Sequence, residues 1–407
     1  MTEPRILQIV HDHPDVTNGG TEWIAADLTR ALRRSGAPTT LLAASTSLSR
    51  PEMAPGSLAE AGEDLLLRTG RYDAFAMLRL DGSGWIAALE RILGRTRPDI
   101  VHLHGLDRIG SDVVAAIRSR SRARIVVTLH DFQPICAKDG LMVTSEGALC
   151  SRAEPARCRQ CLPELSVARH ALREAHLKAV LSGVDLVVLP SRFAMERYAA
   201  WGLPREKMVL LPNGVPGRAP ALPVQGHRFA FFGNVADHKG VHVLLDAAAR
   251  LAAREADLRI TIHGGFTWSA EAERAGFEAA LARAAPLAHN HGPYDRSDLP
   301  GLMDRTDWVV VPSTWWENAP LVILEAQRSG RPVICTGIGG MAEAVEDGRT
   351  GLHVPRNDPA ALAETIARAD ADLCRRLAAN IRPPTDTDAM AQAHLAQYRR
   401  LCQEALA

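Results

Sequence analysis

Two carboxylates eight residues apart, Glu317 and Glu325, lie in the stretch of sequence best suited to chemistry. An apolar run of strand length ends before them at Pro312-Ser313, and Pro320 favours a helix start because proline suits the first helical position. Backbone N–H groups at a helix start attract anions, and ionised carboxylates accept hydrogen bonds from hydroxyl groups. This stretch therefore predicts a site for an anionic ligand rich in hydroxyl groups.

Glycine-containing turns in both halves of the chain offer further backbone donors. Gly19-Gly20 follows an apolar run over residues 6–10, and Gly233 opens a loop that contains Asn234 and ends at Lys239-Gly240. Glycine lets the backbone approach a ligand closely, and a helix that follows such a turn directs N–H groups toward an anion.

Length and composition bound the classes of protein that fit this chain. Its 407 residues exceed what one hydrophobic core usually holds, so two domains are expected. Basic and acidic residues number 47 each, so no overall positive charge favours nucleic acid. We find no signal-peptide pattern and no run of the about 18 apolar residues that a membrane span needs. A cytoplasmic protein is expected, with weak peripheral membrane contact left open.

Apolar runs of strand length alternate with helical patterns along both halves, which predicts parallel doubly wound sheets. We expect strands at residues 6–10, 39–43, 99–105, 125–129 and 185–191, and again at 229–232, 258–262, 307–311 and 332–335, with residues 208–216 as a linker. The periodicity also predicts helices over residues 58–68 and 85–93 and a last helix over residues 390–406.

A proline-containing segment, residues 216–226, separates the two halves and is typical of a linker. The pattern D-x-V-V-x-P-S occurs at residues 185–191 and again at 307–313, which favours two similar domains. We predict an N-terminal domain over residues 1–212 and a second domain over residues 213–387. The C-terminal helix, residues 388–407, is expected to pack back on the first domain.

In their order along the chain, these motifs resemble those of the retaining glycosyltransferases of family 4, which have the GT-B fold. The resemblance extends over nearly the whole chain and includes Gly19-Gly20, T-L-H-D ending at His130-Asp131, P-N-G-V at 212–215, the loop ending at Lys239-Gly240, E-x7-E, and D-G-x-x-G at 347–351. It implies two Rossmann-like domains of the α/β class that face an interdomain cleft. Asn234 departs from the family, which commonly has arginine there, and leaves Lys239 as the obvious cation for phosphate.

The resemblance implies transfer of a sugar, with retention, from a nucleotide-sugar donor of UDP or GDP type to a hydroxyl of a sugar, lipid-linked or small-molecule acceptor. It makes His130 and Glu317 candidate catalytic residues that contact the sugar, and assigns Glu325 to the ribose hydroxyls. The remaining candidates for donor binding are Gly19, Gly20, Gly233, Asn234, Lys239, Asn318, Ala319, Pro320 and Leu321. No catalytic metal is expected.

Other interpretations fit some of the same residues. A nonhydrolysing epimerase of GT-B fold would act on the same donor, and a non-catalytic zinc-stapled binding protein would not turn it over. The G-x-G-x-x-A pattern at residues 337–342 lies too late in its domain for a dinucleotide fingerprint, so we interpret it as a close backbone approach beside the donor site. Asp386 and Asp388 form a D-x-D pattern that we interpret as a helix cap rather than a metal motif.

Four of the seven cysteines are concentrated in residues 136–161. Cys136, Cys150, Cys158 and Cys161 include a C-x2-C pair, and four thiolates suit a closed structural zinc site. The irregular spacing of the first pair leaves reduced free cysteines as an alternative, and the cytosol disfavours disulfides. Because this cysteine-rich loop follows His130-Asp131, we expect it to border the acceptor side.

Overall fold

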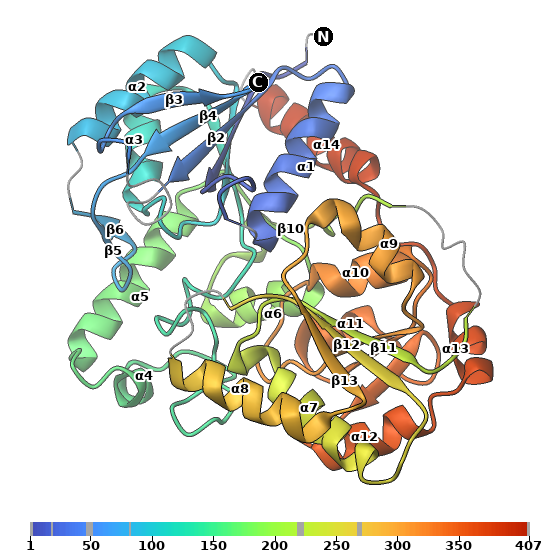
Figure 1. Cartoon of the computed structure of the whole chain (residues 1–407). Helices are drawn as coiled ribbons and strands as arrows, with labels where there is room; N and C mark the ends of the chain where they lie inside the picture. The colour runs from blue at the N-terminus through green and yellow to red at the C-terminus, as the bar shows by residue number, and fades with distance from the viewer. Residues whose placement is uncertain are drawn as a thin grey trace. The chain divides into compact units, whose positions relative to one another are not determined.

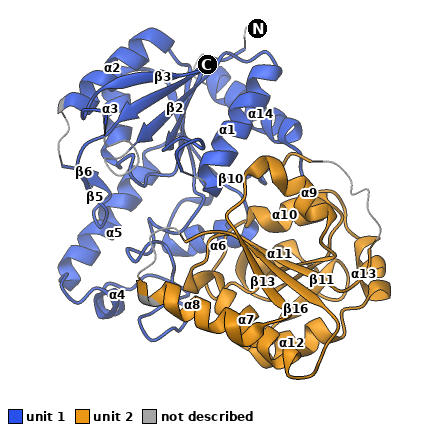
Figure 2. Ribbon diagram, viewed as in Figure 1, with its two compact units in different colours: residues 1–214, 385–407 blue, residues 215–384 orange. Residues whose placement is uncertain are grey.

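The computed structural model describes residues 3–17, 19–45, 52–80, 83–217, 224–266 and 271–404. The chain divides into two compact units, of which unit 1 comprises Met1–Gly214 with Thr385–Ala407 and unit 2 comprises Val215–Pro384 (Figure 1, Figure 2). The first boundary lies two residues after the predicted position and the second three residues before it.

Unit 1 is built on a sheet of eight strands among the described residues, in the order β10-β9-β8-β7-β1-β2-β4-β3. Neighbouring strands are parallel except β3 and β4, which are antiparallel. Strand β7 is buried along its whole length, and its sequence IVHLH brings His102 and His104 into the interior. The strands are β1 (Ile6–His11), β2 (Thr39–Ser45), β3 (Leu58–Ala61), β4 (Asp64–Arg68), β7 (Ile100–His104), β8 (Arg124–Thr128), β9 (Leu186–Leu189) and β10 (Met208–Leu210).

The helices of unit 1 flank this sheet, and the C-terminal helix α14 lies beside α1 (Figure 1). Arg34 at the end of α1 donates to Asp388 at the start of α14 over 2.5 Å. A small hairpin of β5 (Tyr72–Asp73) and β6 (Leu78–Arg79) stands apart from the sheet. The helices are α1 (Gly20–Arg34), α2 (Ser83–Thr96), α3 (Asp112–Arg120), α4 (Pro155–Cys161), α5 (Val167–Ser182), α6 (Arg192–Trp201), the short η1 (Arg205–Lys207), and α14 (Thr387–Glu404).

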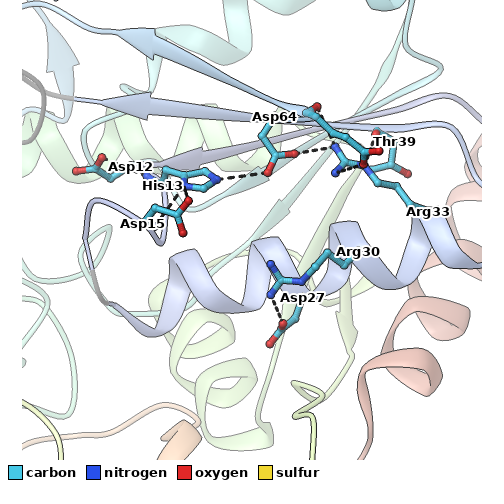
Figure 3. A network of polar contacts seen from close by, with 9 residues as sticks. Asp12, His13, Asp15, Asp27, Arg30, Arg33, Thr39 and Asp64 are labelled. Atoms are coloured by element: carbon cyan, nitrogen blue, oxygen red, sulfur yellow. Dashed lines mark hydrogen bonds and ion pairs between the residues drawn. The ribbon is translucent and has the colours of Figure 1, made fainter. Parts of the chain in front are cut away.

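The helix predicted over residues 58–68 is wrong, because this segment forms the hairpin of β3 and β4. Gly62 takes the left-handed conformation at φ 62° that turns the chain back, and β4 pairs with β2. Asp64 at the start of β4 accepts from Arg33 of α1 over 2.7 Å and lies 3.3 Å from His13 Nε2 (Figure 3). Contacts distant in sequence thus override the local helical periodicity.

Unit 2 contains a second parallel sheet, with six strands in its described part, in the order β13-β12-β11-β14-β15-β16. Its core includes the stacked rings of Phe229 and Trp308, whose centroids lie 6.3 Å apart. The strands are β11 (Arg228–Phe232), β12 (Arg259–His263), β13 (Ala288–Gly292), β14 (Trp308–Val311), β15 (Val333–Thr336) and β16 (Gly351–Val354). The helices are η2 (Asp237–Lys239), α7 (Val241–Ala252), α8 (Glu271–Ala284), η3 (Arg296–Asp298), α9 (Leu299–Asp304), α10 (Leu321–Arg328), α11 (Gly339–Ala344), α12 (Pro359–Ala367) and α13 (Ala371–Ala378).

Four features differ from the sequence prediction. Residues 208–210, expected in a linker, form strand β10, because they pair with β9 at the edge of the sheet. Strand β13 was not predicted, because its polar sequence AHNHG forms a mostly exposed edge without apolar alternation. Pro320 is the residue before helix α10 rather than its first helical residue, since its ψ of 118° is extended. Helix α14 begins at Thr387, three residues before the predicted start, and residues 405–407 lie outside the described part of the chain. Asp386 caps this helix as predicted, accepting from the Ala389 amide over 2.7 Å.

Candidate functional site

Glu317 lies in the loop between β14 and α10 and is only 6% exposed. Its Oε1 atom accepts from Lys239 Nζ at 2.8 Å, Ser313 Oγ at 2.9 Å and Trp315 Nε1 at 2.8 Å. Burial alone would raise the pKa of Glu317, but the charge of Lys239 and the three hydrogen bonds hold that pKa below its usual value. Glu317 is therefore held as an anion, and the described residues direct all three donors at one of its oxygens.

Lys239 reaches Glu317 because the preceding loop packs tightly against the end of β14. Gly240 has φ 71°, and a Cβ there would stand 2.0 Å from the Pro312 carbonyl oxygen, so only glycine fits. The Lys239 ammonium also lies 5.0 Å from the centre of the Trp315 ring. One N–H of this ammonium binds Glu317, which leaves two for a ligand.

A second glycine contact fixes the opposite side of the Glu317 loop. The Gly340 amide donates to the Glu317 carbonyl over 2.8 Å, and a Cβ on Gly340 would stand 1.6 Å from the Asn318 carbonyl oxygen. The close backbone approach predicted for residues 337–342 is thereby confirmed. Asn318, Ala319, Pro320 and Leu321 continue from this loop into α10, whose start has no side-chain cap.

Glu325, on α10, is separate from the Glu317 cluster and faces an arginine instead. Its Oε1 atom lies 3.6 Å from Arg296 Nη2, and the two side chains are 13% and 14% exposed. Burial and the charge of Glu325 raise the pKa of Tyr294, which keeps that hydroxyl protonated. The sequence analysis missed Arg296, since no local pattern links it to a residue 29 positions later.

The predicted phosphate loop begins at a tight contact between two glycines. Gly233 has φ 143°, and a Cβ on Gly264 would stand 1.8 Å from the Gly233 carbonyl oxygen. Asn234 follows on the surface with an exposed side chain. Arg356 is a second cation that the sequence analysis missed, and its Nε atom donates to the Thr314 carbonyl over 2.5 Å.

The glycine turn of unit 1 is already engaged within its own unit. The Gly19 amide donates to the Thr17 carbonyl over 3.0 Å, and a Cβ on Gly19 would stand 2.3 Å from Glu22 Oε2. Glu22 therefore bends back over the start of α1, where its Oε1 atom lies 3.2 Å from His11 Nε2. Burial opposes the charge on His11, but Glu22 outweighs it and raises the pKa of His11 to about 9. Of the predicted pair of amide donors, Gly19 is occupied, and Gly20 is exposed at the first position of α1.

His130 ends a row of hydrogen-bonded side chains that runs from Gln8, in the middle of β1, to the carboxyl ends of β7 and β8. His104 Nδ1 lies 3.1 Å from His130 Nε2, and His104 Nε2 lies 2.5 Å from Gln8 Oε1. Burial lowers the pKa of His130 to about 3, with help from the charges of His11 and His394. A neutral imidazole donates through one nitrogen and accepts through the other, so this row determines which His130 nitrogen carries hydrogen.

A second histidine continues the row toward the C-terminal helix. His102 stacks on His104 with ring centres 4.4 Å apart, and its Nδ1 and Nε2 atoms lie 2.6 Å from the Tyr398 hydroxyl and 2.7 Å from Thr128 Oγ1. Tyr398 belongs to α14, so the end of the chain positions the strands that lead to His130. His102 and His104 are not among the residues that the sequence analysis proposed for the site.

The four clustered cysteines are all free and half-buried, and they line one cavity of unit 1. As the side chains stand, no group of three or more His, Cys, Asp or Glu residues in the described ranges could hold a metal ion. Zinc binding by Cys136, Cys150, Cys158 and Cys161 therefore stays a prediction. None of the described helices is long and apolar enough to cross a membrane.

Curated relatives match part of the chain. A D-inositol 3-phosphate glycosyltransferase of Arthrobacter sp. (strain FB24) is 33% identical over 193 residues, which cover 47% of this chain and 41% of that protein. A protein of the same name from Corynebacterium urealyticum is 35% identical over 168 residues, which cover 40% of this chain and 39% of that protein. The matched region thus spans less than half the length of these relatives.

Solved structures with the same fold cover almost the whole chain. Sucrose-phosphate synthase from Thermosynechococcus elongatus has a TM-score of 0.76 at 20% identity and covers 98% of this chain and 100% of its own. Anabaena Alr3699/HepE, in complex with UDP and glucose, has a TM-score of 0.65 at 17% identity and covers 99% of both chains. The predicted GT-B fold is confirmed by these likenesses.

Two family models match consecutive parts of the sequence. The model described as Glycosyltransferase Family 4 matches residues 18–216, and the model described as Glycosyl transferases group 1 matches residues 226–372. The matches account for most of both units and meet at the linker. The chain therefore belongs to the glycosyltransferases of family 4.

Proposed function

We propose that this chain is a retaining glycosyltransferase that moves a sugar from a nucleotide-sugar donor to an acceptor hydroxyl. The observation that carries the proposal is the cluster in which Lys239, Ser313 and Trp315 all donate to Glu317. A buried carboxylate paired with a lysine presents adjacent negative and positive groups, one suited to sugar hydroxyls and the other to phosphate.

In this proposal, unit 2 supplies the groups that recognise the donor. The free N–H groups of Lys239 and the uncapped start of α10 stabilise the diphosphate as negative charge develops on it. Glu325, held near Arg296, accepts hydrogen bonds from the ribose hydroxyls. Glu317 accepts from sugar hydroxyls through Oε2, to which the described residues send no hydrogen bond.

The reaction breaks the bond between the anomeric carbon and the diphosphate and forms a bond from that carbon to the acceptor oxygen. The acceptor proton passes to the departing phosphate oxygen, so no separate base is assigned. His130 is neutral at pH 7 and contributes a hydrogen bond to the sugar rather than a charge. No residue is assigned as a nucleophile.

UDP-sugars are the donors to test first. Anabaena Alr3699/HepE, which shares the fold, is described in complex with UDP and with UDP-glucose. The curated relatives are named for D-inositol 3-phosphate, so a phosphorylated polyol is the first acceptor to test.

A thermal-shift screen of UDP-, GDP-, ADP- and dTDP-sugars tests the proposal first. We expect one nucleotide class to raise the melting temperature. A ligand concentration about 100 times the Kd would stabilise the protein by about 2.7 kcal/mol. The stabilising sugar nucleotide is then incubated with D-inositol 3-phosphate and with neutral polyols, and the product anomer is determined by NMR. If the protein forms an epimerised sugar nucleotide when no acceptor is present, the transferase proposal is wrong and the protein is an epimerase.

Glu325→Gln tests the donor assignment within the same screen. We expect nucleotide-sugar affinity to fall about tenfold, because an amide offers a ribose only one acceptor oxygen. Glu278→Gln is a matched control, since Glu278 is exposed on α8 of the same unit. Equal affinities of the Glu325 variant and the control would refute the ribose assignment.

A further inference from the structure

The segment between β8 and α5, residues 131–166, has too few buried apolar residues to hold its own conformation. Its regular structure consists of the short helix α4, which has no buried residue, and one isolated bridge between Val143 and Leu149. Its buried hydrophobic residues, Phe132, Ile135 and Met142, all precede Val143. Segments without a core generally need a cross-link or a bound metal.

Four thiols of this segment line one cavity. Cys136, Cys150, Cys158 and Cys161 are free and half-buried, and all four line a cavity of about 40 Å³. The Val143–Leu149 bridge and the bond from the Cys150 amide to the Met142 carbonyl, 2.7 Å long, bring Cys150 back toward Cys136. The other two thiols lie on α4 as the C-x2-C pair. Residues separated by up to 25 positions are therefore gathered around one small space.

The charges around the cavity suit bound thiolates. Lys138 and Arg157 line the same cavity. A divalent cation held by four thiolates leaves a net charge of about −2, which these side chains offset.

A buried histidine nitrogen in the same cavity has no partner. His170, on α5, is 6% exposed and lines the cavity, and the described residues supply no hydrogen bond to its Nε2 atom. Buried polar atoms in folded proteins are rarely left unsatisfied. His170 Nε2 is therefore a buried polar atom of the cavity besides the four thiols, and it is not a ligand in the site proposed below.

We propose that Cys136, Cys150, Cys158 and Cys161 bind one zinc ion as a closed four-thiolate site that holds residues 131–166 in place. As the side chains stand, they do not meet the requirements of a metal site in the described structure, so binding requires the thiols to turn toward the cavity centre. Metal binding deprotonates the thiols and is coupled to the ordering of the residues that carry them. Four soft thiolate ligands favour zinc over harder cations.

The site has a structural connection to His130. Arg173 of α5 is 7% exposed and donates to the carbonyls of Gln133 at 2.5 Å and Pro134 at 2.8 Å. Its Nε atom donates to the Phe75 carbonyl at 2.6 Å in the β5–β6 hairpin. Arg173 thus fixes the residues that follow His130-Asp131, and the zinc would fix the remainder of the same segment.

Metal analysis of the purified full-length chain is the first test. We expect about one zinc per chain and no iron, and the absorption spectrum should show no cluster band in the visible range. The double variant Cys158→Ser/Cys161→Ser should lose the metal. Cys402→Ser is the matched control because Cys402 is a half-buried thiol on α14 outside the cavity, and it should retain the metal. Absence of zinc from the unsubstituted protein after purification without chelators would overturn the proposal. If the protein contains iron instead, the four cysteines form an iron–sulfur site rather than a zinc site.

Single variants test the ligand set. Each of Cys136→Ser and Cys150→Ser should lose most of the zinc, whereas His170→Gln should keep it, because four thiolates complete the tetrahedral shell. Loss of zinc from His170→Gln with retention in Cys136→Ser or Cys150→Ser would overturn the four-thiolate set.

Limited proteolysis separates a structural metal from a fortuitous one. Removing zinc with a chelator should make residues 143–166 at least tenfold more sensitive to cleavage while unit 2 is unaffected. Unchanged cleavage would contradict the structural role, and this readout does not depend on the proposed transferase activity.

Discussion

The pattern D-x-V-V-x-P-S occurs once in each unit, and the two copies begin alike and end differently. Asp185 precedes β9 and accepts from Arg124 at 3.0 Å and from the Ile125 amide at 2.8 Å. Asp307 precedes β14 and accepts from Arg228 at 2.6 Å and from the Gly226 amide at 2.8 Å. In both units the aspartate joins the start of its strand to a neighbouring strand of the same sheet.

The copies separate after the strand. Ser191 lies directly before α6, and its side chain caps that helix by accepting from the Ala194 amide over 3.1 Å. Ser313 is followed by a loop that delays α10 until Leu321, and its hydroxyl donates to Glu317 inside that loop. The same serine therefore stabilises a helix in unit 1 and orients a carboxylate in unit 2. The inserted loop, rather than the shared motif, is where unit 2 acquired its candidate chemistry.

Replacing the aspartate of the repeated pattern should produce the largest effect on stability. Asp307 is fully buried, so Asp307→Asn leaves Arg228 without its charge partner and should lower the free energy of unfolding by about 3–5 kcal/mol. Asp185 is 12% exposed and its partner Arg118 is 38% exposed, so Asp185→Asn should cost about 1–3 kcal/mol. Denaturation with hydrogen exchange followed in β9 and β14 measures both. Equal losses in the two units would contradict the difference in burial.

Removing the carboxylate of the inserted loop should abolish most of the activity. Glu317→Gln breaks the pair with Lys239 and should lower turnover about 100- to 1,000-fold, as expected for loss of a preorganised charge. Turnover with a stabilising sugar nucleotide is the measurement, and Glu278→Gln again serves as the surface control. A loss of less than threefold would mean that the cluster is structural.

The two units should respond to pH in opposite directions. The raised pKa of His11, about 9, contributes stability that is fully present below about pH 6.5 and lost as pH rises through 9, by about 3 kcal/mol. The lowered pKa of Glu317 contributes stability that is present above about pH 4.5 and lost as pH falls below it. Melting of each unit from pH 3 to 10 measures this, and His11→Gln should remove the alkaline loss in unit 1. An alkaline loss that persists in His11→Gln would assign it to another group.

The two serines give the smallest and most specific contrast. Ser191→Ala should cost about 1 kcal/mol of stability through the lost cap and leave turnover unchanged. Ser313→Ala should leave stability nearly unchanged and lower turnover about fivefold, since one of three donors to Glu317 is lost. Melting and turnover are measured for both variants. Identical behaviour of the pair would mean that the motif has one role in both units.

Local sequence patterns determined the fold class and the family. Buried parallel strands favour continuous apolar runs, and such runs indicated most strand positions in both units. Glycines at tight contacts could also be recognised from sequence, because Gly240 and Gly340 leave no room for a side chain. The strands and the glycine turns depend on a residue and its immediate neighbours in the chain, so the spacing of residue types in the sequence was enough to predict them.

Only the tertiary structure decided which side chains act on one another. Lys239 and Glu317 are 78 positions apart, and Gln8 and His104 are 96 apart, so no periodicity could pair them. The same holds for Arg296 beside Glu325, and for the hairpin at residues 58–68, where long-range pairing overrode a helical pattern. Sequence periodicity reports which face of an element is buried, whereas the partner of a polar group is fixed only when separate elements pack together.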